Sequence, residues 1–167
     1  MVGDTVKFTS LAPYRIIVTG RLKQFINAFG EEVMVDNTDK AIAAASASTG
    51  LVVKDYTAAP IYFGDQNQGA HEWLIEFENV PENLTAFTSE LDQHLKNVNS
   101  DYEAKRYKDI ALGLPKVTAV PKGLFNVWLK NKGKHGGQHK VPRLSNDRQY
   151  VDELLLLLQQ YAVPKFV

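Results

Sequence analysis

A change in the period of the hydrophobic pattern near the middle of the chain constrains the fold more than any other feature. Residues 71–77 alternate between polar and apolar side chains, which is typical of a strand with one buried face. After Pro81-Glu82-Asn83, four apolar residues recur at the spacing of an amphipathic helix: Leu84, Phe87, Leu91 and Leu95. A strand followed directly by such a helix favours a fold in which helices pack on a sheet.

Strand and helix patterns also fill the rest of the chain. Extended segments are expected at 5–9, 14–19, 25–27, 32–35, 51–54, 58–63 and 116–120, with Pro60 near a sheet edge. Helices are expected from Asp36 or Asn37 to Gly50, over 101–110, after Gly123, and over 147–160 with Ser145 or Asn146 as cap. Residues 131–141 are expected to form a loop. The predicted fold class is therefore α+β: a small mixed β-sheet with helices packed on it.

The composition is that of one globular domain, and it removes several classes of site. A length of 167 residues predicts a single domain over 1–167. The chain has no cysteine, which excludes disulfides, thiolate metal ligands and a cysteine nucleophile. Its formal net charge of +0 provides no overall attraction to nucleic acid or an anionic membrane. The N-terminus shows no signal peptide and no apolar run is long enough for a membrane span, so we predict a cytoplasmic protein.

Several familiar motifs are absent or weak. The sequence contains no phosphate-binding Walker loop, no dinucleotide fingerprint and no serine nucleophile elbow. His135 and His139 are four residues apart, but the two glycines between them argue against a helical zinc site, and no metal site is predicted. Glu31-Glu32 is interpreted as a charged turn, and residues 102–107 as an exposed helix face. The run Leu154–Leu158 is interpreted as core, with a further face covered by another part of the protein.

The segment 130–143 is the most unusual part of the sequence. It holds four lysines, one arginine and two histidines, and no acidic residue. Backbone N–H groups and lysine ammonium groups on such a loop can together bind a phosphate or polyphosphate, although a solvated loop has the same composition. Pro142 stiffens one end of the segment. Lys140 is therefore better positioned to bind an anion than Lys132 or Lys134.

Two further candidates lie near the N-terminus. The carboxylate of Asp4 can accept hydrogen bonds from a sugar diol, and the guanidinium of Arg21 can bind a phosphate through two donors. The alternatives are a simple turn at Gly3-Asp4 and an exposed strand end at Arg21 and Lys23. Spacing alone favours these alternatives.

Taken in order, four of these segments resemble a known family: Gly3-Asp4, residues 14–32, Asn99-Ser100-Asp101-Tyr102, and the Gln-His-Lys-Val-Pro-Arg motif at 138–143. They are similar to the C-terminal part of the Gretchen Hagen, or auxin-responsive promoter, family in its bacterial form. The resemblance runs from Gly3 to about Leu154. Members of this family are acyl-acid–amido synthetases of the adenylate-forming superfamily. The five-leucine helix is not typical of the family.

The resemblance implies a ligase that adenylates a small carboxylic acid with ATP and Mg²⁺ and then transfers the acyl group to an amino acid. It implies that this chain is the small mobile lid domain, a fragment whose partner is a large N-terminal catalytic domain of the same polypeptide. Residues 1–24 are then a hairpin segment next to the hinge. The large domain holds the acyl pocket and most ATP and Mg²⁺ contacts, so the isolated chain is expected to be inactive.

The resemblance also assigns roles to four residues. Lys140 corresponds to the lysine that reaches the α-phosphate during adenylation and is the predicted catalytic residue. Asp4 corresponds to the carboxylate that holds the ribose hydroxyls, and Arg21 to the arginine near the nucleotide. Lys23 occupies the hinge position of the wider superfamily, where plant members of the family differ.

Two alternatives remain open on the sequence alone. One is an enzyme like the acyl-CoA ligases, which transfers the acyl group to a thiol; the motif around Lys140 favours amide formation instead. The other is a non-catalytic α+β module that binds an anion or a partner through residues 130–143.

Overall fold

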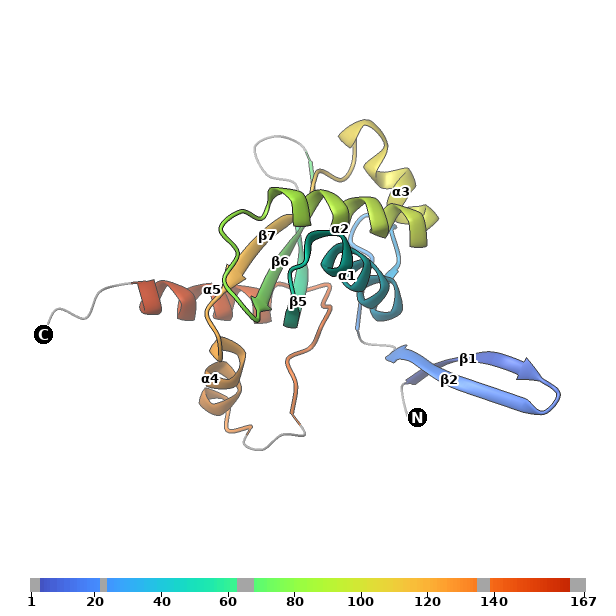
Figure 1. Ribbon diagram of the computed structural model, residues 1–167, viewed down its shortest axis with the longest axis horizontal. Coiled ribbons are helices and arrows are strands. Elements are labelled where there is room, and N and C mark those ends of the chain that lie inside the picture. The colour runs from blue at the N-terminus through green and yellow to red at the C-terminus, as the bar shows by residue number, and fades with distance from the viewer. Residues whose placement is uncertain (1–3, 22–23, 63–67, 135–138, 163–167) are drawn as a thin grey trace, which may run out of the picture.

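The computed structural model describes residues 4–21, 24–62, 68–134 and 139–162. Seven strands lie in these ranges: β1 (Asp4–Leu11), β2 (Tyr14–Arg21), β3 (Phe25–Ile26), β4 (Val33–Met34), β5 (Val53–Ile61), β6 (Ala70–Phe77) and β7 (Lys116–Val120). The helices there are α1 (Val35–Thr49), α2 (Thr85–Val98), α3 (Ser100–Arg106), the 3₁₀ turn η1 (Tyr107–Asp109), α4 (Leu124–Asn131) and α5 (Gln149–Ala162). Figure 1 shows their arrangement.

The central sheet has the strand order β5-β6-β7. Strand β5 pairs antiparallel with β6, and β6 pairs parallel with β7, so the sheet is mixed. Two pairs of strands, β1–β2 and β3–β4, form separate antiparallel ribbons. This architecture confirms the predicted α+β class with a small mixed sheet.

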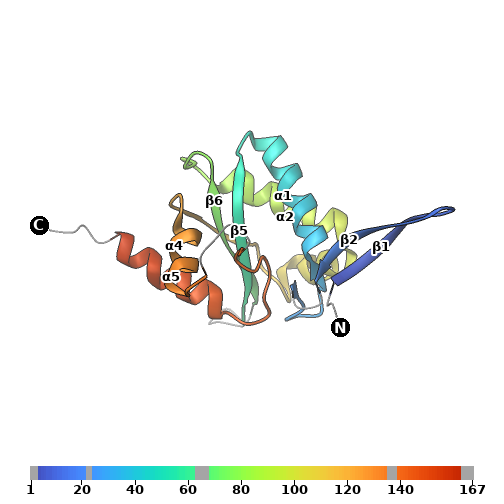
Figure 2. The same ribbon diagram turned by 90° about the horizontal axis from the view of Figure 1, so that it is seen from below.

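The sheet is covered on both faces, as the alternation of its side chains requires. Trp73, Ile75 and Phe77 of β6 pack with α1 and α2, and Leu74 packs into a second core with α4 and α5. Figure 2 shows α1 and α2 on one side of β5 and β6, and α4 and α5 on the other. The domain therefore has two hydrophobic cores separated by one sheet.

Some element boundaries differ from the prediction. The two strands expected at 51–54 and 58–63 are one strand, β5, whose pairing with β6 continues through Tyr56 and Thr57 after a shift near Val53. The helix expected at 101–110 ends at Arg106, because Lys108 and Asp109 adopt left-handed conformations with φ of 52° and 54°. Pro60 lies on β5, an outer strand of this sheet, where a residue without N–H is tolerated.

The β1–β2 hairpin projects from the rest of the domain (Figures 1 and 2). Its apolar side chains are at least half exposed or close to it: Val6, Phe8, Leu11, Tyr14, Ile16, Ile17 and Val18. An isolated two-stranded ribbon with this surface is only marginally stable by itself. The run at the other end of the chain is partly core, since Leu154 is fully buried whereas Leu156 is exposed.

None of the helices in the described ranges combines the length and the hydrophobicity needed to cross a lipid bilayer.

Candidate functional site

The segment after Lys140 is attached to the outer edge of β5. The backbone N–H of Ala58 donates to the carbonyl of Arg143 (2.8 Å), and the N–H of Ser145 donates to the carbonyl of Ala58 (3.2 Å). Thr57 Oγ1 donates to the carbonyl of Pro142 (2.7 Å). These bonds form a short parallel bridge between Ala58 and Leu144. The basic loop therefore ends in a segment that the sheet holds in place.

The side chains of this segment alternate between the cores and the surface. Val141 is buried in the core with α4 and α5, and Leu144 is buried in the core with α1 and α2. Arg143 forms an ion pair with Asp39 of α1, and its guanidinium carbon lies 5.2 Å from the centre of the Tyr56 ring. Lys140 is exposed, directly before the buried Val141. The arrangement presents the ammonium group of Lys140 to solvent from an ordered backbone.

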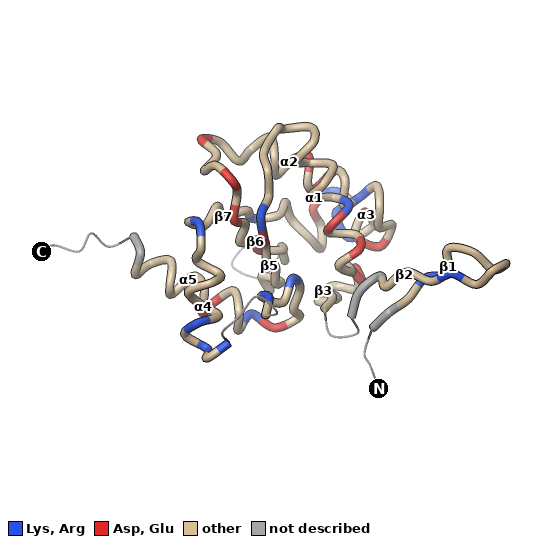
Figure 3. The backbone as a smooth tube through the Cα atoms, turned by 60° about the horizontal axis from the view of Figure 1, so that its bottom comes forward, with Lys and Arg blue, Asp and Glu red and all other residues tan. Residues whose placement is uncertain are grey.

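The other cations of segment 130–143 have different surroundings. Lys132 donates to Glu153 Oε1 of α5 (2.7 Å) and lies over the ring of Trp128, so it stabilises the contact between α4 and α5. Lys130 and Lys134 are exposed. Figure 3 shows basic positions recurring along the chain between α4 and α5. Lys140 thus differs from Lys132, whose ammonium group is paired within the domain.

The positive charges of the same segment act on the carboxyl group of Asp55 on β5. Burial raises the pKa of its carboxyl group, although the Tyr56 N–H and the positive charges of Arg143 and Lys140 act in the opposite direction. Lys140 therefore lies in the electrostatic surroundings of β5.

The N-terminal candidates are brought together only in part. Asp4 and Arg21 are paired across the base of the β1–β2 hairpin. Their side chains and the whole of Lys23 lie outside the described part of the structure. The roles of Asp4, Arg21, Lys23 and Lys140 that the family resemblance implies stay predictions.

Glu31 differs from the prediction of a charged turn. Its side chain is fully buried, and His71 Nε2 on β6 donates to Glu31 Oε1 (2.8 Å). The N–H of Phe29 donates to Glu31 Oε2 (2.7 Å). Burial alone raises the pKa of Glu31, but the hydrogen bond and charge of His71 and the backbone donors outweigh it and lower the pKa. Only Glu32 remains exposed, so the two acids do not act as a pair.

Residues 102–107 also differ from the predicted exposed helix face. Tyr102 is fully buried and donates to Asp92 Oδ1 of α2 (2.8 Å). Arg106 is buried and donates to both oxygens of Asp92, at 2.7 and 3.0 Å. Burial alone raises the pKa of Asp92, but hydrogen bonds from Arg106, Lys96 and Tyr102 lower it. Two of the cationic and aromatic residues in this segment therefore join α3 to α2.

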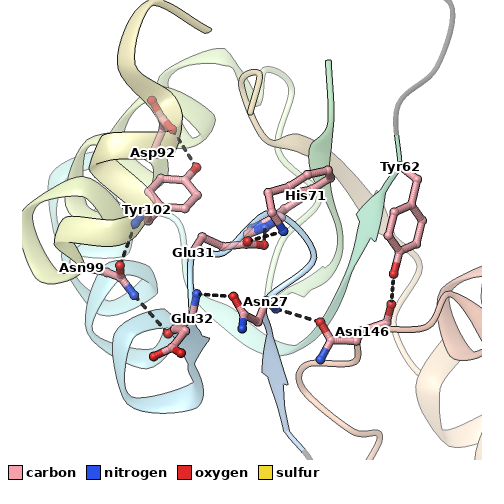
Figure 4. A network of polar contacts seen from close by, with 10 residues as sticks. Asn27, Glu31, Glu32, Tyr62, His71, Asp92, Asn99, Tyr102 and Asn146 are labelled. Carbon is pink, nitrogen blue, oxygen red and sulfur yellow. Dashed lines mark hydrogen bonds and ion pairs between the residues drawn. The ribbon is translucent and has the colours of Figure 1, made fainter. Parts of the chain in front are cut away.

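Asn27, Tyr62 and Asn146 connect distant segments, a role that the sequence did not indicate for any of them (Figure 4). Asn146, expected as a cap of the last helix, instead accepts a hydrogen bond from the N–H of Asn27 through Oδ1 (2.7 Å). Tyr62 Oη donates to the carbonyl of Asn146 (2.6 Å). Helix α5 begins later, at Gln149, whose N–H donates to Asp147 Oδ1. No local sequence signal distinguishes these contacts from ordinary capping, because their partners are far away in the sequence.

The residues that the structure describes include no group of three or more His, Cys, Asp or Glu side chains that could hold a metal ion. His139 is exposed, and His135 lies outside the described residues.

Solved structures show where this arrangement of elements occurs. One, a GH3.15 acyl acid amido synthetase, superposes with a TM-score of 0.73 at 18% identity and is matched over 95% of this chain. A second, an AtGH3.15 acyl acid amido synthetase in complex with 2,4-DB, gives a TM-score of 0.71 at 18% identity over 94% of this chain. The chain spans only 29% and 30% of the lengths of those two proteins. At this identity the likeness establishes the fold.

The family follows from the sequence itself. Residues 36–149 match the GH3 family C-terminal domain. The chain belongs to this family, which confirms the resemblance that its motifs indicated. The match begins after the hairpin, so the assignment of 1–24 as a hinge-proximal segment of one 1–167 lid domain stays a prediction. No curated protein matches the chain.

Proposed function

We propose that the chain is the C-terminal lid domain of an ATP-dependent acyl acid amido synthetase. The observation that carries this proposal is the attachment of the Lys140 segment to β5 in a domain of the GH3 family. The backbone is held on both sides of the sheet by Val141 and Leu144, and the ammonium group faces outward. A catalytic cation delivered by a moving domain needs this combination of a fixed base and an accessible charge.

The proposed reaction has two steps. In the first, a carboxylate oxygen of the acid attacks the α-phosphorus of ATP, the bond from this phosphorus to the bridging oxygen breaks, and pyrophosphate leaves. In the second, the amine nitrogen of an amino acid attacks the acyl carbon, AMP leaves, and the nitrogen loses a proton. Lys140 acts in the first step. Its positive charge offsets the negative charge that builds on the phosphoryl oxygens.

The remaining groups are assigned as follows. Asp4 holds the ribose hydroxyls, Arg21 lies near the nucleotide phosphates, and the backbone at Lys23 rotates between the two steps. Mg²⁺ would offset the charge of the ATP phosphates, and the family resemblance assigns it mainly to the large N-terminal domain. That domain would also hold the acyl pocket and most ATP contacts, so the isolated chain is expected to release little or no pyrophosphate.

The exposed hairpin supports an N-terminal domain as the partner. Tyr14, Leu11 and Val18 are 77%, 69% and 65% exposed, and several exposed apolar side chains on one ribbon are typical of an interaction surface. The solved synthetases with this fold are more than three times as long as the matched part. We therefore assign the surface that packs against this hairpin to the N-terminal domain of the full-length polypeptide.

The test uses the full-length polypeptide that contains this domain. Lys140→Ala should lower the rate of acid-dependent ATP–pyrophosphate exchange by about 10²- to 10³-fold, because it removes a charge that stabilises the transition state. Lys134→Ala is the matched control, since it removes an exposed lysine of the same loop. It should retain at least about a third of the exchange rate. Equal losses in both variants would assign the effect to the general charge of the loop and refute the role of Lys140.

A screen of acceptors distinguishes the proposed reaction from its alternatives. The acyl-adenylate formed by the full-length enzyme should release AMP when amino acids are added and should not respond to coenzyme A. Release with the thiol alone would identify an acyl-CoA ligase. Absence of pyrophosphate exchange with every carboxylic acid tested would support a non-catalytic binding module.

A further inference from the structure

Asn146 lies where three segments of the chain meet (Figure 4). Its Oδ1 accepts the N–H of Asn27, 119 residues earlier in the chain (2.7 Å). Its carbonyl accepts the hydroxyl of Tyr62, which follows β5 (2.6 Å). The ring of Tyr62 also lies 6.2 Å from that of Phe29. One asparagine therefore joins the segment after β3, the end of β5 and the segment that carries Lys140.

The backbone of Asn146 is held independently of its side chain. Before it, Arg143 and Ser145 are bonded to Ala58. After it, Arg148 donates to the carbonyl of Pro60 (3.0 Å) and to Glu72 Oε2 (2.6 Å). The side-chain oxygen of Asn146 is therefore not needed to hold this segment on the sheet. It connects the segment to Asn27.

On the far side of this bond, Asn27 belongs to a tightly bonded loop. Its own Oδ1 accepts the N–H of Glu32 (3.2 Å), and the N–H of Phe29 donates to the buried Glu31. The loop follows β3 directly. The Asn27–Asn146 bond therefore links the part of the domain nearest its N-terminal connection to the part nearest Lys140.

We propose that Asn146 is a positioning residue for Lys140. Its side chain fixes the 140–146 segment relative to the loop after β3, so that both move as one body when the domain changes its orientation. This role rests on the proposed function, because it matters only where Lys140 must reach a phosphate held elsewhere. Asn146 itself does not touch the reacting atoms.

The test uses the full-length enzyme and measures both half-reactions. Asn146→Ala should slow ATP–pyrophosphate exchange by about 10-fold. This is more than the effect expected from losing one hydrogen bond and less than that expected from misplacing a reacting group by about 1 Å. The substitution should leave amide formation from supplied acyl-adenylate within about 2-fold, since Lys140 acts in the first step only. Asn146→Asp keeps the acceptor oxygen and should restore most of the exchange rate.

A matched control separates positioning from stability. Asn83 Oδ1 accepts the N–H of Thr85 at the same distance, 2.7 Å, but within one turn. Asn83→Ala should therefore leave exchange unchanged while costing similar thermal stability. If Asn146→Ala fails to fold, Tyr62→Phe removes the other bond to Asn146 and should slow exchange by about 3-fold.

Each outcome decides the proposal. Slowed exchange with Asn146→Ala, rescue by Asn146→Asp and no effect of Asn83→Ala support it. Unchanged exchange with Asn146→Ala, or equal slowing of both half-reactions, overturns it. Lys140→Ala is measured in parallel: if that variant exchanges pyrophosphate normally, the proposed function fails, whereas if only Lys140→Ala is slow, this inference alone fails.

Discussion

At the scale of single residues, substitution of the buried Asp92 is expected to lower the stability of the domain strongly. Its buried carboxylate accepts hydrogen bonds from Tyr102 and Arg106, and Arg106 is equally buried. Asp92→Asn leaves the buried guanidinium of Arg106 with only the exposed carboxylate of Asp109 as counter-charge, and should lower the free energy of unfolding by about 3 kcal/mol. Asp36→Asn is the control, since it breaks an exposed pair with Lys40 and should cost less than about 1 kcal/mol. Urea denaturation of both variants measures the difference, and equal costs would contradict a buried pair.

Glu31 gives the domain a pH dependence of known sign. Its pKa is lowered in the folded state, so it binds fewer protons there than in the unfolded state. The resulting stability is present above the ordinary pKa of a glutamate, about 4.3, and is lost as the pH falls through the lower folded value. Glu31→Gln should therefore flatten the fall of unfolding free energy between about pH 5 and pH 3. Glu82→Gln makes the same substitution at an exposed position and is measured as the control.

The sequence was least informative at this scale. Adjacent acids at 31 and 32 have opposite environments, because the partner that buries Glu31 is His71, 40 residues away. Gly30 and Glu32, the residues on either side of Glu31, both have a left-handed backbone. The burial of Asp92, Tyr102 and Arg106 was not predicted for the same reason, because their polar groups form hydrogen bonds inside the protein. Burial of a polar residue depends on a distant partner, and spacing does not reveal that partner.

At the scale of elements, the start of β6 depends on a close contact with the loop after β3. A Cβ atom on Gly69 would lie 2.1 Å from the nearest ring atom of Phe29, far inside a normal contact. Gly69→Ala should therefore destabilise the domain by about 1 to 3 kcal/mol through overpacking. Phe29→Ala in the same chain should remove most of that additional cost. Denaturation of the single and double variants checks this, and fully additive costs would show that the ring is not what the methyl group meets.

Elements were more predictable than residues, because the hydrophobic period is a local property. Helix α1 ends at Thr49, and the expected Gly50 follows as its C-cap in a left-handed conformation with φ of 73°. Strand β6 and helix α2 follow the two periodicities at 71–77 and 84–95. The gap expected between 51–54 and 58–63 was wrong, because pairing with β6 continues through Asp55, Tyr56 and Thr57. The attachment of residues 142–145 to β5 was not predicted, since one short parallel bridge has no sequence pattern of its own.

At the scale of the whole molecule, the hairpin should behave as an interface. Phe8 and Ile16 are 57% and 55% exposed, so Phe8→Ser with Ile16→Thr should change the unfolding free energy of the α+β body by less than about 1 kcal/mol. The same substitutions should weaken binding of this chain to a separately produced N-terminal portion by at least about 10-fold. Exposed Val80→Ser, on a loop elsewhere, is the control. Calorimetric titration measures the binding, and equal affinity of all variants would exclude the hairpin as the contact surface.

The central claim is that Lys140 acts in adenylation and in no other step. The most direct measurement compares, in one preparation of the full-length Lys140→Ala variant, the rate of acyl-adenylate formation with the rate of amide formation from supplied acyl-adenylate. The account predicts that the first rate falls by about 10²-fold or more and that the second stays within about 3-fold of the unsubstituted enzyme. A parallel fall of both rates would contradict it.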